Sequence, residues 1–309
     1  MRTALVTHAE CLRHDMGAHH PEQPARLSAI EDQFISSGIA DYLARYEAPL
    51  ASDEQLERVH PREYVRAIRE VAPSEGTVHL DPDTAMNPHT LHAALRAAGA
   101  GVLATDLVLK GEASSAFCPV RPPGHHACRT RAMGFCIFNN VAVAARHAVK
   151  AHGLKRVAII DFDVHHGNGT EDVFSDDEHV LMASIFQHPF YPYSGTEDPA
   201  PNMHNVPLAA GAGGKELRRA VSEVWLPALE RFKPQLVFFS AGFDAHVEDD
   251  MAMLRFVDSD YRWVTERVAD IAQRHAAGRM VSLLEGGYAL DALGRSAVQH
   301  VRVLAGLNS

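Results

Sequence analysis

The chain has 309 residues, of which 46% are hydrophobic and 22% charged, the balance of an ordinary globular protein. Its formal net charge of −10 argues against a nucleic-acid partner, because binding to phosphates needs a basic surface. The N-terminus lacks the apolar core of a signal peptide and no apolar run approaches the length of a membrane span, so we expect a cytoplasmic protein without a membrane partner. The cysteines fit no zinc-finger or disulfide framework and are expected to be reduced thiols: Cys11, Cys118, Cys128 and Cys136.

Strand-like and helix-like segments alternate along the sequence. The first half predicts a strand at 4–7, a helix at 24–36, a capping box at 52–55, a helix beginning at Pro61, a long helix at 90–109 and a strand at 115–120. The second half predicts helices at 142–152, 215–231, 260–275 and 290–304, and strands at 156–162, 180–186, 236–240 and 280–284. This series predicts one α/β domain over residues 1–309, with a mainly parallel sheet covered by helices on both faces. Residues 189–202 are interpreted as a long functional loop.

A row of polar side chains follows the apolar strand that begins at Arg156. Because side chains of a strand alternate between its faces, Asp161, Asp163 and His165 of the sequence DFDVHH project the same way. Open α/β sheets bind ligands at the carboxyl ends of their strands, and carboxylates and imidazoles are ligands for zinc. The row therefore indicates a metal site. The alternative is a solvated strand end in which His165 caps the next helix.

A rigid turn carries a histidine pair. Residues 121–127 read RPPGHHA, and the prolines and glycine can hold His125 and His126 towards one cavity. Beside a metal, such a pair can take a proton from water and return one to a leaving group. The alternative is a solvated loop with two incidental histidines.

Two further segments follow predicted strands. Asp244, in the sequence SAGFDAH, is either a third metal ligand or an ordinary helix N-cap. Tyr288, in the sequence LEGGY, either donates its phenol to an oxyanion or is a packing residue. No segment decides alone, but four strand-end segments that agree on one chemistry do.

The same segments resemble a known family. In order along the chain, residues 121–127, 134–140, 161–169, 240–246 and 285–288 resemble motifs of the histone deacetylase superfamily, and HPE at 20–22 with RL at 26–27 is also similar. The likeness is greatest to its bacterial, class II-like amidohydrolases, whose relatives include acetylpolyamine amidohydrolases. The resemblance implies the three-layer arginase/deacetylase fold, with a central, mainly parallel sheet of about eight strands between helices.

The resemblance also implies roles for particular residues. The positions carried over are the ligands of one zinc ion, Asp163, His165 and Asp244, the tandem acid–base histidines, His125 and His126, and the carbonyl-binding phenol of Tyr288. Asp161 would orient His125. Asn168 stands where other members have an acidic partner for His126, so this histidine should be harder to protonate.

A structural potassium ion and a substrate tunnel belong to the same resemblance. The potassium ligands it implies are Asp161, Asp163, His165, Ser184 and its neighbour Ile185. The tunnel residues it implies are Gly134, Phe135, Tyr191 and Met251. A second potassium site is left open: Phe174 fits it, but Asn202 stands where an aromatic residue is often found. Some polyamine-selective relatives use an acidic gatekeeper residue, and Met251 does not provide one.

The expected function is zinc-dependent hydrolysis of an N-acetyl amide on a lysine-like or other primary amine. Hydrolysis of acetylpolyamines or small amides at the same site is the alternative, and a metal-stabilised binding module without turnover is a further one. An arginase-like enzyme with two manganese ions is disfavoured, because its aspartate-rich ligand sets are missing. Acyl preference, zinc against iron(II), and a homo-oligomeric state are left open.

Overall fold

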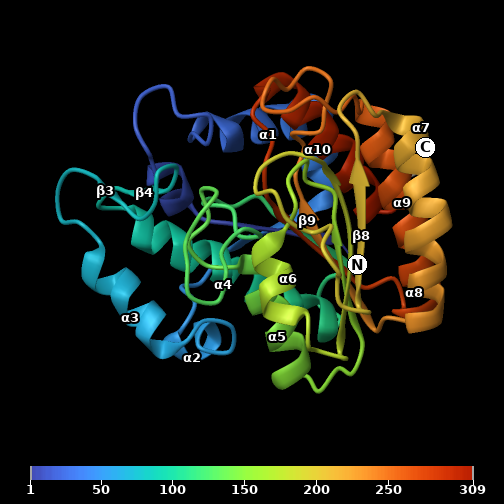
Figure 1. Ribbon diagram of the computed structural model, residues 1–309, viewed down its shortest axis with the longest axis horizontal. Coiled ribbons are helices and arrows are strands. Elements are labelled where there is room, and N and C mark those ends of the chain that lie inside the picture. Colours follow the sequence, from blue (N-terminus) through green and yellow to red (C-terminus); the bar gives the residue numbers. More distant parts are fainter. Residues whose placement is uncertain (1, 308–309) are drawn as a thin grey trace.

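The centre of the computed structural model, which describes residues 2–307, is an eight-stranded sheet with only parallel strand pairs (Figure 1). The predicted domain also includes residues 1, 308 and 309, which lie outside the described residues. The order across the sheet is β2-β1-β5-β10-β9-β6-β7-β8. The strands are β1 (Thr3–Thr7), β2 (Leu43–Glu47), β5 (Ser115–Cys118), β6 (Val157–Asp161), β7 (Val180–Gln187), β8 (Met203–Leu208), β9 (Leu236–Ala241) and β10 (Met280–Leu284).

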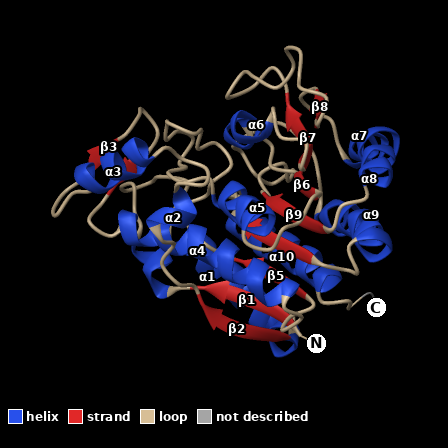
Figure 2. Cartoon of the chain, turned by 90° about the horizontal axis from the view of Figure 1, so that it is seen from below, coloured by secondary structure: helices blue, strands red, loops and turns tan. Residues whose placement is uncertain are grey.

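Helices cover both faces of this sheet (Figure 2). One face packs against α1, α9 and α10, with α7 and α8 beside α9, and the other packs against α4, α5 and α6. The helices are α1 (Ala25–Ser36), α2 (Asp53–Leu56), α3 (Arg62–Val71), α4 (Thr90–Leu109), α5 (Asn140–Lys150), α6 (Asn168–Phe174), α7 (Gly214–Ala220), α8 (Leu226–Phe232), α9 (Asp258–His275) and α10 (Leu290–Leu304). The predicted three-layer fold with a parallel eight-stranded sheet is confirmed.

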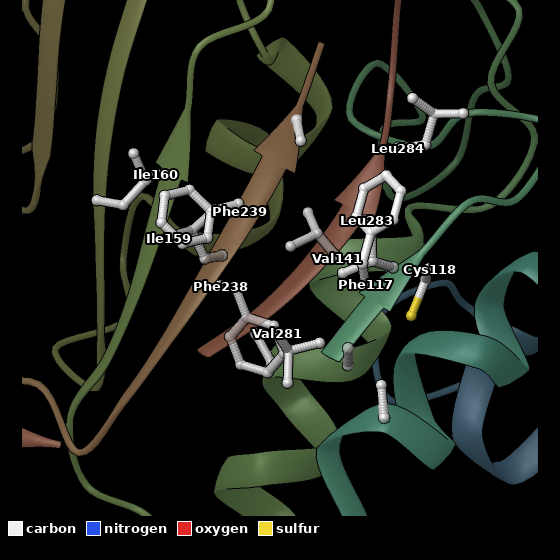
Figure 3. Packing of buried hydrophobic residues seen from close by; sticks show 14 of the residues in the cluster. Phe117, Cys118, Val141, Ile159, Ile160, Phe238, Phe239, Val281, Leu283 and Leu284 are labelled. Carbon is white, nitrogen blue, oxygen red and sulfur yellow. The ribbon is translucent and has the colours of Figure 1, made fainter. Parts of the chain in front are cut away.

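The middle strands are apolar on both sides because helices cover both faces. Phe117 of β5, Phe239 of β9 and Leu283 of β10 are fully buried in one core with Val141 of α5 (Figure 3). The apolar stretch of β6 ends at Asp161, which pairs in register with Ser184 of β7 and with Ser240 of β9. Polar side chains therefore gather at the carboxyl edge of the sheet.

Several elements differ from the sequence-based expectation. Strands β2 and β8 were not predicted, because they lie at the two edges of the sheet, where half-exposed strands lack a continuous apolar run. The small antiparallel pair β3 (Val78–His79) and β4 (Ala85–Met86) is too short to leave a pattern. The single helix predicted at 215–231 is α7 and α8 joined by a π-helical turn at Val221–Trp225.

Helix α4 corrects the expectation that no apolar run approaches membrane-spanning length. By length and composition this helix could cross a membrane, and it is the one such helix within residues 2–307. However, 72% of its apolar window is buried inside the fold, where it packs on α5 and β5. A core helix in contact with a sheet needs such a composition, so α4 is explained by the fold.

A buried ion-pair network ties the N-terminal segment to two turns that carry candidate site residues. Fully buried Glu22 accepts hydrogen bonds from Arg121 (Nη2 to Oε2, 2.7 Å) and from Arg26 (Nη1 to Oε1, 3.0 Å). Arg121 begins the tandem-histidine turn. Arg26 donates to the carbonyl oxygens of Glu285 at 2.5 Å and Gly287 at 2.6 Å. Glu22 of the HPE motif and Arg26 of the RL motif therefore hold the tandem-histidine turn and the turn at 285–288 in place.

Glu22→Gln is expected to lower the free energy of unfolding at pH 7 by about 3–5 kcal/mol, because buried guanidinium groups lose their counter-charge. Burial raises the pKa of Glu22, but Arg121, His14 and Arg26 outweigh burial and hold this pKa well below its usual value. Since the folded-state pKa is the lower one, the stabilisation is present above about pH 4 and is lost as the pH falls through the folded-state pKa. Denaturant unfolding at several pH values measures the difference, which should shrink in acid. Glu31→Gln, in an exposed ion pair of α1, is the control and should cost at most about 1 kcal/mol.

Candidate metal centre and active site

Three potential metal ligands meet at the carboxyl ends of neighbouring strands. Asp163 and His165 follow β6, and Asp244 follows β9, which lies beside β6 in the sheet. One ligand atom from each residue lies within 4.8 Å of the other two. His165 Nδ1 is 2.9 Å from Asp163 Oδ1 and 3.2 Å from Asp244 Oδ2. The sheet topology thus brings the three predicted ligands together.

This donor set fits a divalent cation. Asp163 and Asp244 are buried, and within residues 2–307 Asp244 Oδ2 has no hydrogen-bond partner, since the Nδ1 proton of His165 lies nearer Asp163. Burial and the charge of Asp163 raise the pKa of Asp244 to about 6. Burial lowers the pKa of His165, but the hydrogen bond to Asp163 and the nearby Asp244 carboxylate outweigh burial and raise this pKa to about 9. Two buried carboxylates that face one imidazole need more positive charge, and zinc accepts these ligands.

The tandem histidines lie beside the three ligands and are each oriented from behind. Nδ1 of His125 is 2.9 Å from Asp161 Oδ2, and Nδ1 of His126 is 2.7 Å from Asn168 Oδ1. Both partners are acceptors, so each ring carries its proton on Nδ1 and keeps Nε2 for the site. His125 Nε2 is 3.8 Å from Asp163 Oδ1. All the predicted orienting contacts are therefore present in the geometry.

The two imidazoles have opposite electrostatic surroundings. Burial lowers the pKa of His125, but the charges of Asp163 and Asp161 outweigh burial and hold this pKa well above its usual value. For His126, burial and the positive charges of His125 and His165 all hold the pKa well below its usual value. The pair therefore divides into one imidazole that favours a charge and one that favours the neutral form.

Two glycines let the backbone approach the site closely. The N–H of Gly286 donates to Asp163 Oδ2 at 2.8 Å, and a Cβ at this position would overlap the carboxylate oxygens of Asp163 and Asp244. Gly134 has a φ of +57°, and a Cβ there would overlap the ring of His126. Side chains at either position would displace a candidate ligand or a tandem histidine.

A cavity of about 180 Å³ opens beside the tandem histidines. The predicted residues that line it are His125, His126, Gly134, Phe135, His165, Tyr191, Met251 and Tyr288. Residues that sequence reasoning did not assign to the site also line it: Asp83, Pro123, Phe190 and Gly286. Phe190 stacks on His165, with ring centroids 5.5 Å apart, and its place beside Tyr191 in the segment 189–202 was an available signal. Asp83 lies in the β3–β4 turn and has no sequence signal.

Tyr288 is held at the cavity wall by three contacts. The N–H groups of Tyr288 and Ala289 donate to Asp249 Oδ2 at 2.6 Å and 3.0 Å. The guanidinium of Arg26 lies 5.0 Å from the centre of the Tyr288 ring, and the Phe135 ring meets it edge-on at 6.1 Å. Sequence reasoning did not assign Asp249 to the site, although its acidic side chain fixes the turn that presents the phenol.

A further pair of polar side chains lies on β6, the strand that leads to two of the candidate metal ligands, and on its neighbour β7. Asp161 on β6 and Ser184 on β7 are register partners, and Ile185 follows in the buried part of β7. Within residues 2–307, Ser184 Oγ is a buried atom without a hydrogen-bond partner. A buried hydroxyl left unsatisfied beside a carboxylate fits the predicted monovalent-cation site, because such an oxygen needs an ion or a proton donor.

The region of the second potassium site holds a side-chain amide. Asn202 Nδ2 donates to the carbonyl oxygens of Phe174 at 2.8 Å, Asp177 at 3.1 Å and Val180 at 2.9 Å. Carbonyl oxygens are acceptors only, so the amide nitrogen must be the atom that faces them. The amide therefore occupies the space between these carbonyl oxygens.

His166 turns away from the cavity, as the alternation along the strand predicts. Its Nδ1 is 2.8 Å from Ser194 Oγ and its Nε2 is 2.7 Å from Glu171 Oε2. Both ring nitrogens therefore have partners that are not candidate metal ligands.

Comparison with known proteins identifies the family. Residues 20–304 match the family model described as histone deacetylase domain. A histone deacetylase-like amidohydrolase of Pseudomonas aeruginosa is 39% identical, over 93% of this chain and 82% of that protein. The human polyamine deacetylase HDAC10 is 36% identical, over 99% of this chain and 48% of that protein. The crystal structure of the HDA15 HD domain has a TM-score of 0.91 at 33% identity and covers 100% of this chain and 91% of that structure. The chain therefore belongs to the histone deacetylase family and is a hydrolase.

Proposed function

We propose that the protein is a zinc-dependent deacetylase that removes an acetyl group from a lysine-like or other primary amine. The observation that carries the proposal is that two oriented imidazoles and His165 of an Asp–His–Asp ligand set line one cavity. The Pseudomonas aeruginosa relative is named as a histone deacetylase-like amidohydrolase, which supports the same reaction class. We expect Asp163, His165 and Asp244 to hold the metal.

The chain's own residues then divide the work of amide hydrolysis. A zinc ion on these ligands would polarise a carbonyl and make a water molecule more acidic. His126, with Nε2 unprotonated, accepts the proton that water releases as it attacks the carbonyl carbon, and His125 stabilises the developing negative charge. The imidazolium formed at His126 then protonates the nitrogen of the departing amine. Tyr288 donates its phenol to the carbonyl oxygen as charge grows there.

The cavity walls support a linear acetylated chain as the substrate. Phe135 and Tyr191 give the cavity aromatic walls, and its volume suits an acetamide on an alkyl chain rather than a folded ligand. Acetylpolyamines are the second candidate, because the Asp83 carboxylate in the wall favours a substrate with a further positive charge. Met251, where an acidic gatekeeper would favour polyamines, argues for acetyl-lysine instead.

A turnover panel tests this proposal. The purified protein is assayed with acetyl-lysine peptides, acetylputrescine, acetylspermidine and longer acyl-lysines, each with and without a metal chelator. We expect chelator-sensitive release of acetate, fastest from an acetyl-lysine peptide. Binding of these amides without any turnover would favour the non-catalytic binding module, and turnover confined to acetylpolyamines would favour the second candidate.

We also infer that the chain binds one structural potassium ion rather than two. The unpaired hydroxyl of Ser184 beside Asp161 supports an inner site, where this ion would keep the buried carboxylate charged and rigid behind His125. The amide of Asn202 takes the place of the second ion, since its nitrogen lies among three carbonyl oxygens and its two N–H groups can serve two of them at a time.

Asn202→Ala is expected to make stability more dependent on potassium. In potassium-free choline chloride the variant should lose about 1–3 kcal/mol of unfolding free energy for each carbonyl left without a partner or water. Potassium should restore part of that loss, because three converging carbonyls then enclose a space for the ion. Urea unfolding in potassium and in choline chloride measures the shift. The matched control is Asn205→Ala, whose amide serves Glu171 and the Gly195 carbonyl, and which should show no extra potassium rescue.

A further inference from the structure

Away from the cavity, one cluster of titratable side chains joins two helices on the same face of the sheet. It consists of Asp106 on α4, His147 on α5 and His152 just after α5. Helix α4 leads into β5 and α5 leads into β6, so both helices end near the amino ends of these strands. The cluster therefore lies at the opposite edge of the sheet from the candidate active site, and the proposed hydrolysis does not use it.

The geometry of the cluster brings three potential ligand atoms together. Asp106 Oδ1 is 2.8 Å from His147 Nε2 and 2.6 Å from His152 Nε2, and the three atoms lie within 4.8 Å of one another. The two rings meet edge-on, with an interplanar angle of 77°, and both Nε2 atoms lie against the same carboxylate oxygen. The side chain of His147 is 9% exposed and that of His152 is 22% exposed, so solvent reaches the cluster while packing fixes it.

We propose that Asp106, His147 and His152 form a second metal site, which takes a borderline divalent transition-metal ion such as zinc, nickel or cobalt. Two imidazoles disfavour magnesium and calcium, which prefer all-oxygen ligand sets, and the carboxylate supplies charge. Three protein ligands at a solvent-accessible position leave further coordination to water. The bound ion ties α4 to the end of α5 and stabilises the folded state without taking part in turnover.

Arg58 opposes metal binding, so replacing this residue should strengthen metal binding and offers a second test of the site. Its Nη1 donates to His147 Nδ1 at 2.8 Å, which places the ring proton on Nε2, towards Asp106. A metal on Nε2 requires that proton to move to Nδ1 and the guanidinium to turn away. Glu54, whose side chain is 84% exposed, bonds the other guanidinium nitrogen at 2.8 Å and can follow it into solvent. Lys110 approaches only the second Asp106 oxygen, at 3.7 Å, and leaves Oδ1 to the imidazoles.

The test measures zinc bound per chain when the catalytic centre is disabled. Every protein carries Asp244→Asn, so that the zinc content reports binding to Asp106, His147 and His152. After equilibrium dialysis against zinc, this background protein should hold one zinc ion per chain and unfold at a higher temperature than without zinc. Adding His152→Gln should remove both effects, because glutamine can keep a hydrogen bond to Asp106 but is a poor zinc ligand. Adding Arg58→Gln should lower the zinc Kd, because a competing donor and positive charge are gone.

The matched control is His275→Gln in the same background. His275 Nε2 is 2.7 Å from Glu230 Oε2, so His275 forms a histidine–carboxylate pair like that of His152 with Asp106. Within residues 2–307, however, His275 belongs to no group of three potential metal ligands. This variant should bind zinc like the background protein. Zinc that persists after His152→Gln, or a background protein that binds none, would overturn the proposal. Should His152→Gln unfold, Asp106→Asn replaces it. The experiment does not depend on deacetylation, so its failure is distinct from failure of the proposed function.

Discussion

Asp244→Asn should remove the metal ion of the candidate active site, and turnover with it, while leaving the chain folded. A neutral amide oxygen is a poor substitute for a carboxylate ligand, so we expect metal affinity at this site to fall by more than about 100-fold, beyond the effect of a lost supporting contact. Turnover should fall below detection, because the remaining residues cannot activate water alone. Inductively coupled plasma mass spectrometry and initial rates on an acetyl-lysine peptide measure the two effects in one preparation.

The same variant makes a second, opposite prediction for stability. Without metal, Asp163 and Asp244 are facing buried carboxylates, and burial together with their repulsion raises the pKa of Asp244 to about 6. Removing one charge relieves this repulsion, so metal-free Asp244→Asn should unfold at the same or a higher denaturant concentration than the metal-free wild type. Asp270→Asn, on the exposed side of α9, is the neutral control. A metal-free variant that is less stable than the metal-free wild type would contradict the predicted repulsion between Asp163 and Asp244.

Tyr288→Phe should lower kcat by about 10²–10³-fold, the usual cost of one oxyanion donor, with little change in KM. The ring should keep its place between Arg26 and Phe135, since the contacts that hold it involve the ring and the backbone rather than the hydroxyl. Metal content should equal that of the wild type, which separates this variant from a ligand substitution. Steady-state kinetics with metal analysis measures both quantities.

Tyr191→Phe is the matched control for that result, because it removes a phenol hydroxyl from another residue that lines the same cavity. The Tyr191 hydroxyl is buried without a hydrogen-bond partner within the described residues, and its ring packs edge-on against His126. We assign it no part in the chemistry and expect kcat to stay within a few-fold of the wild type. Near-wild-type kcat in Tyr288→Phe would refute the assigned role of Tyr288.

The site residues that could be predicted from the sequence are those that stand next to a strong local pattern. The row Asp161, Asp163 and His165 follows from strand alternation, and Asp244 and Tyr288 from their positions after apolar runs. The tandem-histidine and tunnel roles came mainly from the resemblance. That β9 lies next to β6, which places Asp244 opposite Asp163, is a property of strand order and has no local signal.

The parts that sequence reasoning missed depend on contacts between distant segments. Asp83 reaches the cavity from a hairpin of two-residue strands, and Asp249 reaches the Tyr288 turn from a loop after β9. Strands β2 and β8 are edge strands whose polar faces resemble loops. The sequence alone shows that Asn202 departs from the family pattern, but only the three converging carbonyl oxygens explain what its amide does.

Zinc restoration of turnover tests the account most directly. The protein is stripped with a chelator, dialysed and titrated with zinc while acetate release from an acetyl-lysine peptide is followed. We predict no turnover in the stripped protein and full turnover after one equivalent at Asp163, His165 and Asp244, with no further gain from additional zinc. Undiminished turnover by protein that mass spectrometry shows to be free of metal would contradict the account.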